Sequence, residues 1–201
     1  MPHHHRFSVI GTSGSGKTTL GRALAARLAI PFVELDSIVH QANWVALPDA
    51  EFRARVAALV DGERWVIDGN YHVVRDLVWD RATAIVWLDL PRWQIMAQVI
   101  WRSVSRAATG AELWNGNRER WSKLIDRDHP IRWAWRTFHE RRQRYTELHD
   151  ARWVRLRSRR EMRRWLDEVG REGKKVVMLT PTLTGSPGLT GRSSNHRTSL
   201  G

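Results

Sequence analysis

The chain of 201 residues contains no cysteine, and this excludes a disulfide framework, thiolate catalysis and a cysteine-based zinc site. No uninterrupted apolar run approaches the roughly 18 residues that a membrane-spanning helix needs, and no secretory signal opens the chain. An apolar share of 42% with 12 Trp is nevertheless enough for a packed core. These observations predict a soluble, cytoplasmic protein without a membrane partner.

Lysine is scarce as well, since only four of the 33 basic residues are Lys and the rest are Arg. Residues 1–91 hold 9 basic and 10 acidic residues, whereas residues 92–165 hold 19 basic and 8 acidic residues. Because guanidinium groups make paired contacts to phosphate oxygens, the basic half predicts an anionic partner. A solvated helix face is the alternative for many of these side chains, and we favour it for Arg141, Arg142, Arg144, Arg159, Arg160, Arg163 and Arg164.

Short apolar segments alternate with amphipathic ones along the chain. The apolar segments predict strands over residues 6–10, 32–35, 65–67, 84–88 and 153–156. The amphipathic segments predict helices over residues 17–29, 48–60, 92–107, 118–125, 131–148 and 159–169. Strands that alternate with helices at this spacing indicate βαβ units and a parallel sheet.

The composition divides the chain into one domain and a tail. Residues 1–169 are expected to form the α/β domain, in which residues 108–137 make a helical, arginine-rich lid. Gly170 is expected to end the ordered structure. The segment from Thr180 onward is rich in Gly, Ser, Thr and Pro, so residues 170–201 are predicted to be a disordered tail.

A glycine-rich segment follows the first expected strand and precedes the first expected helix. It fits the pattern GxxxxGK[ST] without a mismatch and consists of Gly11, Thr12, Ser13, Gly14, Ser15, Gly16, Lys17 and Thr18. Such a loop directs backbone N–H groups and the positive end of a helix dipole at phosphates. We expect Lys17 to reach the β- and γ-phosphates of ATP, Thr18 to bind Mg²⁺, and Thr19 to donate to the α-phosphate.

Two aspartates follow expected strands at the same edge of the sheet. Asp68 is predicted to hold the water shell of Mg²⁺ beside Thr18, although Asp-Gly is also a common turn pair. Asp36 is predicted to take the proton of an acceptor hydroxyl or to hold that hydroxyl by a hydrogen bond. Capping of a helix N-terminus is the alternative role for Asp36.

Several arginines are candidates for binding anionic groups. Arg102 and Arg106 stand four residues apart and so share one helix face. Arg75 is predicted to hold a phosphate of the acceptor, and a surface salt bridge with Asp76 or Asp80 is the equal alternative. The segment expected to form the lid contains three further candidates, which are Arg118, Arg127 and Arg136. A closing lid of this kind would exclude water and stabilise charge on the transferred group.

Five stretches carry a resemblance to a known family, and they are GTSGSGKTTL, ELDSIVHQANW, WVIDGNY, IVWLDLP and ELWNGNRERW. Together they resemble the bacterial adenylate kinase-like P-loop family often labelled "DNA topology modulation protein". The resemblance covers about residues 6–169 and implies a three-layer nucleoside-monophosphate-kinase fold with a parallel sheet in the order 2-3-1-4-5. It also implies that Asp68 is the aspartate of the family's Asp-Gly motif and that Arg102 and Arg106 neutralise charge on the transferred phosphoryl group.

The sequence therefore predicts an ATP- and Mg²⁺-dependent phosphotransferase that acts on a small acceptor, with a nucleotide as one candidate. The alternative is a nucleic-acid-associated ATPase or regulator, and a nucleotide-binding protein without turnover is a third reading. The nucleic-acid reading is less favoured because no helix-turn-helix, zinc-finger or single-strand-binding signature is present. Tryptophans such as Trp65, Trp87, Trp93 and Trp101 are predicted to pack in the protein rather than to stack on bases. The oligomeric state is not indicated.

Overall fold

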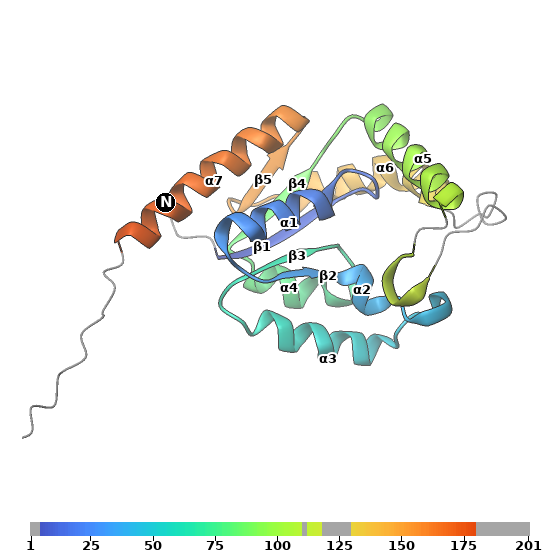
Figure 1. The fold of residues 1–201 in the computed structure, drawn as a ribbon, viewed down its shortest axis with the longest axis horizontal. Helices are drawn as coiled ribbons and strands as arrows, with labels where there is room; N and C mark the ends of the chain where they lie inside the picture. The colour runs from blue at the N-terminus through green and yellow to red at the C-terminus, as the bar shows by residue number, and fades with distance from the viewer. Residues whose placement is uncertain (1–4, 110–111, 118–129, 180–201) are drawn as a thin grey trace, which may run out of the picture.

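The computed structural model describes residues 5–109, 112–117 and 130–179 (Figure 1). Five parallel strands form one sheet in the order β2-β3-β1-β4-β5. The strands are β1 (Arg6–Gly11), β2 (Phe32–Glu34), β3 (Trp65–Asp68), β4 (Ala84–Leu88) and β5 (Trp153–Leu156). The predicted strands, strand order and three-layer fold of the nucleoside-monophosphate-kinase type are confirmed.

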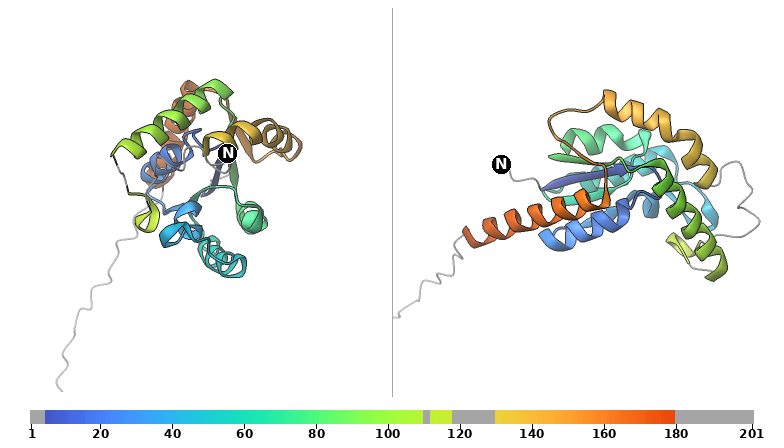
Figure 2. Two further views of the ribbon diagram at one scale, coloured as in Figure 1. Left: turned by 90° about the vertical axis from the view of Figure 1, so that its right-hand side faces the viewer. Right: turned by 90° about the horizontal axis from the view of Figure 1, so that it is seen from above.

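Helices cover both faces of the sheet. They are α1 (Lys17–Leu28), α2 (Leu35–Val39), α3 (Asp49–Val60), α4 (Arg75–Arg81), α5 (Arg92–Thr109), α6 (Pro130–Glu147) and α7 (Arg159–Leu179). Three short 3-10 turns lie at η1 (Ala42–Trp44), η2 (His72–Val74) and η3 (Trp114–Gly116). Figures 1 and 2 show α7 alongside α1 on one face and α3 with α4 on the other.

Two hydrophobic cores follow from the alternation of side chains along each strand. In β1, Phe7 and Val9 face α1 and α7, whereas Ile10 faces the layer of α2, α3 and α4. The central strands are buried on both sides, as expected for a parallel sheet covered by helices. A third, smaller core joins α5 to α6 through Val99 and Phe138.

The sheet gathers polar residues at the carboxyl ends of its strands. Val9 and Glu34 both stand opposite Asp68 in the strand register, so the ends of β1, β2 and β3 lie side by side. Ligand sites in open α/β sheets lie at this edge, where the strand order reverses. The fold therefore places the glycine-rich loop after β1 beside the acidic ends of β2 and β3.

The last helix differs from the prediction, because α7 continues through Gly170 to Leu179 instead of ending at residue 169. Gly170 is buried against α1, and a Cβ atom there would lie 3.2 Å from Cδ of Arg27. The glycine thus permits close contact between two helices and does not mark a stop. The boundary of the predicted tail at residue 170 is wrong, and residues 180–201 lie outside the described part of the chain. The predicted helix 118–125 lies outside it too.

The tryptophan prediction is confirmed for the strands and wrong for α5. Trp65 and Trp87 are buried, but Trp93 and Trp101 are 70% and 74% exposed. Eight residues separate them, so they share one face of α5, while Ile95 lies on the face that packs against the core. Despite this apolar surface, none of the helices in the described ranges is long and apolar enough to cross a membrane.

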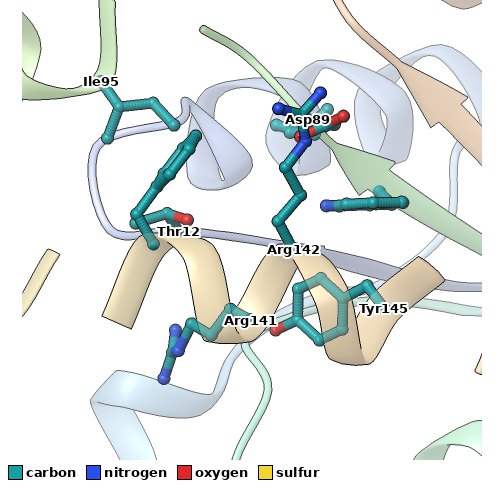
Figure 3. Close-up of a pocket in the computed structure, with 9 residues that line it drawn as sticks. Thr12, Asp89, Ile95, Arg141, Arg142 and Tyr145 are labelled. Atoms are coloured by element: carbon teal, nitrogen blue, oxygen red, sulfur yellow. The ribbon is translucent and has the colours of Figure 1, made fainter. Parts of the chain in front are cut away.

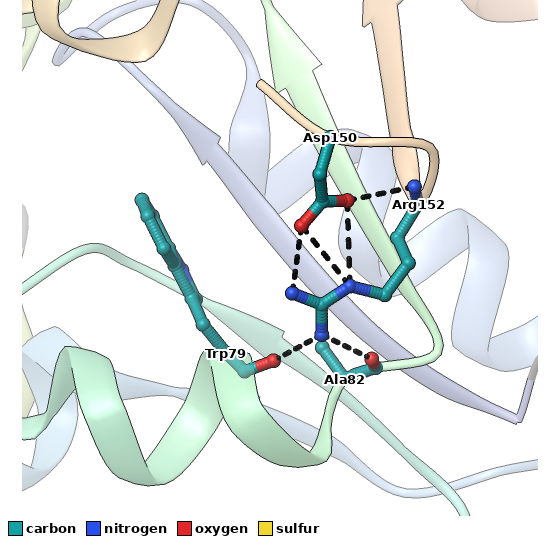
Figure 4. Close-up of polar contacts among 4 residues, drawn as sticks. All are labelled: Trp79, Ala82, Asp150 and Arg152. Carbon is teal, nitrogen blue, oxygen red and sulfur yellow. Dashed lines mark hydrogen bonds and ion pairs between the residues drawn. The ribbon is translucent and has the colours of Figure 1, made fainter. Parts of the chain in front are cut away.

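Arg152, just before β5, connects the edge of the sheet to the end of α4 (Figure 4). Its guanidinium makes a paired contact with Asp150, at 2.8 Å from Nη2 to Oδ2 and 3.2 Å from Nε to the same oxygen. Its Nη1 donates to the carbonyl oxygens of Trp79 and Ala82 at 2.7 and 3.2 Å. These carbonyls lie at the C-terminus of α4, where helical carbonyls lack partners in the helix.

We predict that Arg152→Ala lowers the free energy of unfolding by about 1–3 kcal/mol, because it removes a charged donor from two carbonyls. Urea denaturation measures the change. Arg55→Ala is the control, since Arg55 makes only an exposed pair with Glu51, which contributes at most about 0.5 kcal/mol. Equal losses in the two variants would show that Arg152 does not hold α4.

Candidate functional site

The glycine-rich loop turns tightly between β1 and α1. Gly14 and Gly16 have φ angles of 82° and 92°, in the left-handed region that favours glycine. A Cβ atom on Gly14 would lie 2.3 Å from Cγ2 of Val99, so the loop also packs closely against α5. The amide of Ser15 donates to the carbonyl of Thr12 at 3.0 Å and closes the turn.

The loop has the donors that a chain of phosphates requires. Gly16 precedes α1 without any side-chain cap, so the first N–H groups of the helix are directed at the loop. The buried hydroxyl of Ser15 has no hydrogen-bond partner within the described residues. Nζ of Lys17 donates to the carbonyl of Thr12 at 3.4 Å, which places the ammonium group across the loop. The residues present thus fit a nucleoside triphosphate.

Thr18 begins a group of oxygen atoms suited to Mg²⁺. Its hydroxyl donates to Oδ2 of Asp68 at 2.5 Å and lies 3.2 Å from Oε1 of Glu34. The described residues include no cluster of three or more His, Cys, Asp or Glu side chains that could hold a metal ion. Magnesium fits such a site, because it commonly uses one or two protein oxygens together with water and substrate phosphates. The sequence predicted Thr18 and Asp68 for this role but missed Glu34, the last residue of β2.

Asp68 is 3% exposed, and burial raises the pKa of its carboxyl group. The ammonium group of Lys17 and the hydrogen bond from Thr18 oppose this rise, while Asp36 and Glu34 add to it. Three carboxylates therefore share a small region with one lysine. Such a concentration of negative charge next to a phosphate-binding loop is favourable only when a cation joins it.

Arg102 contacts the phosphate loop directly. Its Nη2 donates to the hydroxyl of Ser13 at 3.0 Å, so α5 places a guanidinium at the predicted position of the phosphates. Arg106 lies one turn further along α5 and is half-buried. Of the predicted lid arginines, Arg136 is exposed on α6, and Arg118 and Arg127 lie outside the described residues.

Asp36 lies in the first turn of α2, near the end of β3. The hydroxyl of Tyr71 donates to Oδ1 of Asp36 at 2.5 Å, and Nε2 of His40 lies 3.4 Å from the same hydroxyl. Glu34 is the residue at the N-cap, and no side chain caps α2. The capping alternative for Asp36 is therefore wrong. Burial and the nearby Asp36 carboxylate strongly raise the pKa of Tyr71, which keeps its hydroxyl protonated as a donor.

Arg75 lies at the start of α4 with its guanidinium beside the ring of Trp79, 5.2 Å from the centroid. Its Nε donates to Oδ1 of Asn70 at 3.1 Å. The alternative of a salt bridge with Asp76 is wrong, because Asp76 pairs with Arg53 at 2.7 Å. Within the described ranges no ion pair joins Arg75 to Asp80 either.

Arg141 is not the solvated residue that the sequence suggested. It lines a small pocket with Thr12 and Tyr145, and Figure 3 shows that Arg141 and Arg142 extend from opposite sides of α6. Burial lowers the pKa of Arg141, and the positive charge of Arg75 lowers it further. A partly buried guanidinium that lines a pocket next to Thr12 of the phosphate loop is suited to binding an anion.

Asp89, at the end of β4, holds α6 in this position. Its buried carboxylate accepts from Nη2 of Arg155 at 2.6 Å and pairs with Nε of Arg142 at 3.1 Å. The guanidinium of Arg155 also lies on the ring of Trp87, 4.3 Å from its centroid. Arg142 is thus an ion-paired side chain and not a freely solvated one. This contact fixes the side of α6 from which Arg141 extends.

Over part of its length the chain is similar to known shikimate kinases. The sequence profile of the shikimate kinase family matches residues 13–50, which include the phosphate loop from Ser13 onward, Glu34 and Asp36. The shikimate kinase of Ruegeria pomeroyi is 38% identical over 75 residues, 37% of this chain and 35% of the relative. That of Parasynechococcus marenigrum is 31% identical over 105 residues, 45% of this chain and 55% of the relative. The chain thus spans about a third to about half the length of these two curated relatives.

Solved structures show the same fold. The shikimate kinase from Acinetobacter baumannii in complex with shikimate has a TM-score of 0.52 at 18% identity, covering 88% of this chain and 92% of that one. The shikimate kinase from Aquifex aeolicus has a TM-score of 0.50 at 20% identity, covering 85% of this chain and 98% of that one. Together with the sheet order and the loop, these similarities define a P-loop protein with the fold of small-molecule kinases.

We predict that Asp68→Asn weakens the binding of Mg²⁺-ATP by about 10- to 100-fold, as for residues that support a metal, without destabilising the free protein. The pKa of Asp68 is higher in the folded protein than in the unfolded chain. The charged carboxylate therefore lowers stability once the pH has risen through the folded pKa, and an amide removes this effect at pH 7. Calorimetric titration and thermal unfolding measure both quantities.

Asp76→Asn is the matched control for this experiment. Arg53 lowers the pKa of Asp76 to about 2, so its charge stabilises the fold above the unfolded pKa and this contribution is lost as the pH falls. The control should thus reduce the Tm at pH 7 and leave Mg²⁺-ATP binding unchanged. A reduced Tm for Asp68→Asn together with unchanged binding would contradict the assignment.

Proposed function

We propose that the protein is an ATP-dependent phosphotransferase that transfers the γ-phosphoryl group to a hydroxyl group of a small anionic acceptor. One observation carries the proposal: the phosphate loop with its oxygen ligands for Mg²⁺ shares the carboxyl edge of the sheet with Asp36, Arg75 and Arg141. Such a site can hold a triphosphate, a hydroxyl group and a second anion. The similarity to shikimate kinases over residues 13–50 supports it.

The nucleotide half of the site binds and orients ATP. The loop amides and Lys17 contact the phosphates, and Thr18, Asp68 and Glu34 provide the oxygen atoms for Mg²⁺. Mg²⁺, when bound, neutralises charge on the β- and γ-phosphates. Arg102 lies close enough to the loop to stabilise the transferred group. We propose the same role for Arg106 and for Arg127, which the sequence assigns to a lid and which lies outside the described residues.

The acceptor half of the site carries out the proton transfer. Oδ1 of Asp36 is occupied by the Tyr71 hydroxyl, so the second oxygen is oriented to accept the proton of the acceptor hydroxyl. As that proton passes to Asp36, the acceptor oxygen forms its bond to the γ-phosphorus, the bond to the β–γ bridging oxygen breaks, and ADP leaves. Catalysis of this kind depends on positioning and electrostatics and needs no covalent intermediate.

We infer that the acceptor is a hydroxylated carboxylic acid of the shikimate type. A carboxylate is a suitable ligand for guanidinium donors such as Arg75 and Arg141. Asn70 and Tyr145 add further polar groups, with 2.7 Å between Nδ2 of Asn70 and the Tyr145 hydroxyl that accepts from it. The curated relatives bear the name shikimate kinase, and one solved neighbour holds shikimate. A nucleoside monophosphate would bring its phosphate to the same arginines and is the competing outcome.

Four arginines among the described residues of the basic half contact groups within the fold, which does not favour the nucleic-acid alternative. Arg142 and Arg155 are paired with Asp89, and Arg152 is paired with Asp150. Arg141 faces a pocket. These side chains are engaged within the fold and do not form a track for a phosphate backbone.

The test is ADP release from Mg²⁺-ATP with a panel of hydroxylated carboxylic acids, nucleoside monophosphates and uncharged polyols. We expect a carboxylic acid to stimulate release at least tenfold, Lys17→Ala to abolish it, and Arg141→Ala to raise the KM for the acceptor at least tenfold with the KM for ATP unchanged. Arg144→Ala is the matched control, because Arg144 lies on the exposed face of α6 and pairs with Glu140. Stimulation by uncharged polyols alone would refute the anionic acceptor.

A further inference from the structure

Two of the sequence stretches that carry the family resemblance contain segments which, apart from His40, play no part in the site described so far. They are residues 40–44 (HQANW), after α2, and residues 113–117 (LWNGN), after α5. In the structure they lie against each other although about 73 positions separate them. We call this contact the loop clasp. It connects the segment that follows α2 to the segment that follows α5. Asp36 lies on α2, and Arg102 lies on α5.

Asn117 forms the centre of the loop clasp and is 3% exposed. Its Oδ1 accepts from the backbone amide of Trp44 at 2.8 Å, and its Nδ2 donates to the carbonyl of Gln41 at 2.8 Å. Nδ2 also donates to the carbonyl of Trp114, at 2.8 Å, within its own turn. A buried amide with all these bonds made has one orientation, and it holds both loops by their backbones.

The rest of the loop clasp is built around His40. Its ring stacks on that of Trp114, with centroids 6.0 Å apart and an angle of 27°, and meets the edge of Trp44 at 5.6 Å. Nδ2 of Asn115 donates to the carbonyls of Ser37 and His40 at 3.3 and 2.5 Å. The histidine is therefore fixed by two aromatic rings and by its own backbone.

His40 connects the loop clasp to the acceptor half of the site. Its Nε2 lies 3.4 Å from the hydroxyl of Tyr71, and that hydroxyl donates its only hydrogen to Asp36. A donor at Nε2 of His40 completes the bonds of the Tyr71 oxygen. The orientation of the Asp36 carboxylate thus depends on a chain of contacts that runs through Tyr71 and His40 to the turn at Trp114.

The other end of the same segment is fixed to the nucleotide half. Arg102 on α5 contacts Ser13, and Val99 packs on Gly14 of the phosphate loop. Helix α5 thus contacts the phosphate loop, and the loop clasp contacts the segment next to Asp36. A displacement of about 1 Å between reacting groups is enough to reduce a rate about a hundredfold.

We infer that Asn117 is a positioning residue that sets the Asp36 carboxylate relative to the phosphate loop, an inference that rests on the proposed phosphotransfer. Within the described part of the chain, the side-chain hydrogen bonds of Asn117 go to Trp44, Gln41 and Trp114, and none goes to a residue assigned to the nucleotide or acceptor half. Its role is expressed through the loop clasp, so it affects transfer to the acceptor and not the binding of ATP. The same reasoning assigns a supporting role to Asn115 and Trp114.

The experiment compares acceptor-dependent ADP release by the full-length wild type, Asn117→Ala and Asn117→Asp. Aspartate keeps the volume of the side chain but replaces the donor to Gln41 and Trp114 by a carboxylate oxygen. We expect both variants to lower kcat for transfer at least tenfold, with the KM for the acceptor, the Kd for Mg²⁺-ATP and acceptor-independent ATP hydrolysis changed less than twofold. A merely structural role would lower the rate of transfer, the rate of ATP hydrolysis and the number of ATP-binding sites together, in proportion to the amount of folded protein.

Two further variants keep the test decisive. Asn115→Gly retains the left-handed backbone, at φ 56°, and removes only the exposed amide, so it tests the loop clasp if the Asn117 variants do not fold. Asn43→Gly, within the same segment, is the control: Asn43 has an exposed side chain and a left-handed backbone at φ 58° that glycine also adopts, so the variant should behave as wild type.

The possible results separate the two proposals. If the wild type shows no acceptor-dependent release with any compound, the phosphotransfer proposal fails and the positioning role of Asn117 falls with it. If the wild type transfers phosphate and the folded Asn117 variants retain its kcat, the positioning role alone is refuted. A loss of Mg²⁺-ATP binding in these variants would also refute it, because the loop clasp would then act on the nucleotide half.

Discussion

The hydrogen bond from the Thr18 hydroxyl to Asp68 fixes how the phosphate loop sits on the sheet. It joins the first turn of α1 to the end of β3, and the strand register places Glu34 opposite the same aspartate. Asp36 follows Glu34 by two residues, and Tyr71 follows Asp68 by three. The position of the acceptor half therefore depends on the contact between Thr18 and Asp68. The parallel sheet thus sets the distance between the two substrates, and the local loops only refine it.

Much of this arrangement could be predicted because its signals are local. The strands are short apolar runs, and the phosphate loop is a continuous pattern whose residue types follow from anion binding by backbone amides. Arg141 and Glu34 were missed for the opposite reason, since their roles depend on contacts between elements far apart in the sequence. The same holds for Gly170. The sequence alone predicts a helix end there, whereas the structure shows that the glycine allows close contact with Arg27 of α1. Trp101 was predicted to be buried because the sequence alone does not show which face of α5 packs against the rest of the protein.

Electrostatics divides the site into halves of opposite character. The nucleotide half concentrates carboxylates, and burial raises the pKa of Asp68 among them, whereas the acceptor half places Arg75 and Arg141 where they repel each other. Each half is unfavourable by itself and is compensated by a ligand of the opposite charge. Asp89 and the loop clasp both support the acceptor half: Asp89 does so through Arg142 on α6, and the loop clasp does so through His40 and Tyr71. Both supports come from long-range contacts that stabilise the site without contacting its substrates.

The most direct test of phosphoryl transfer is ³¹P nuclear magnetic resonance of the wild-type protein with Mg²⁺-ATP and a hydroxylated carboxylic acid. The account predicts that a phosphomonoester resonance of the acceptor grows as the γ-phosphate resonance of ATP declines, in equal amounts, and that Asp36→Asn removes the new resonance. Growth of inorganic phosphate alone, at a rate independent of the acceptor, would contradict the account and identify the protein as a nucleotide hydrolase.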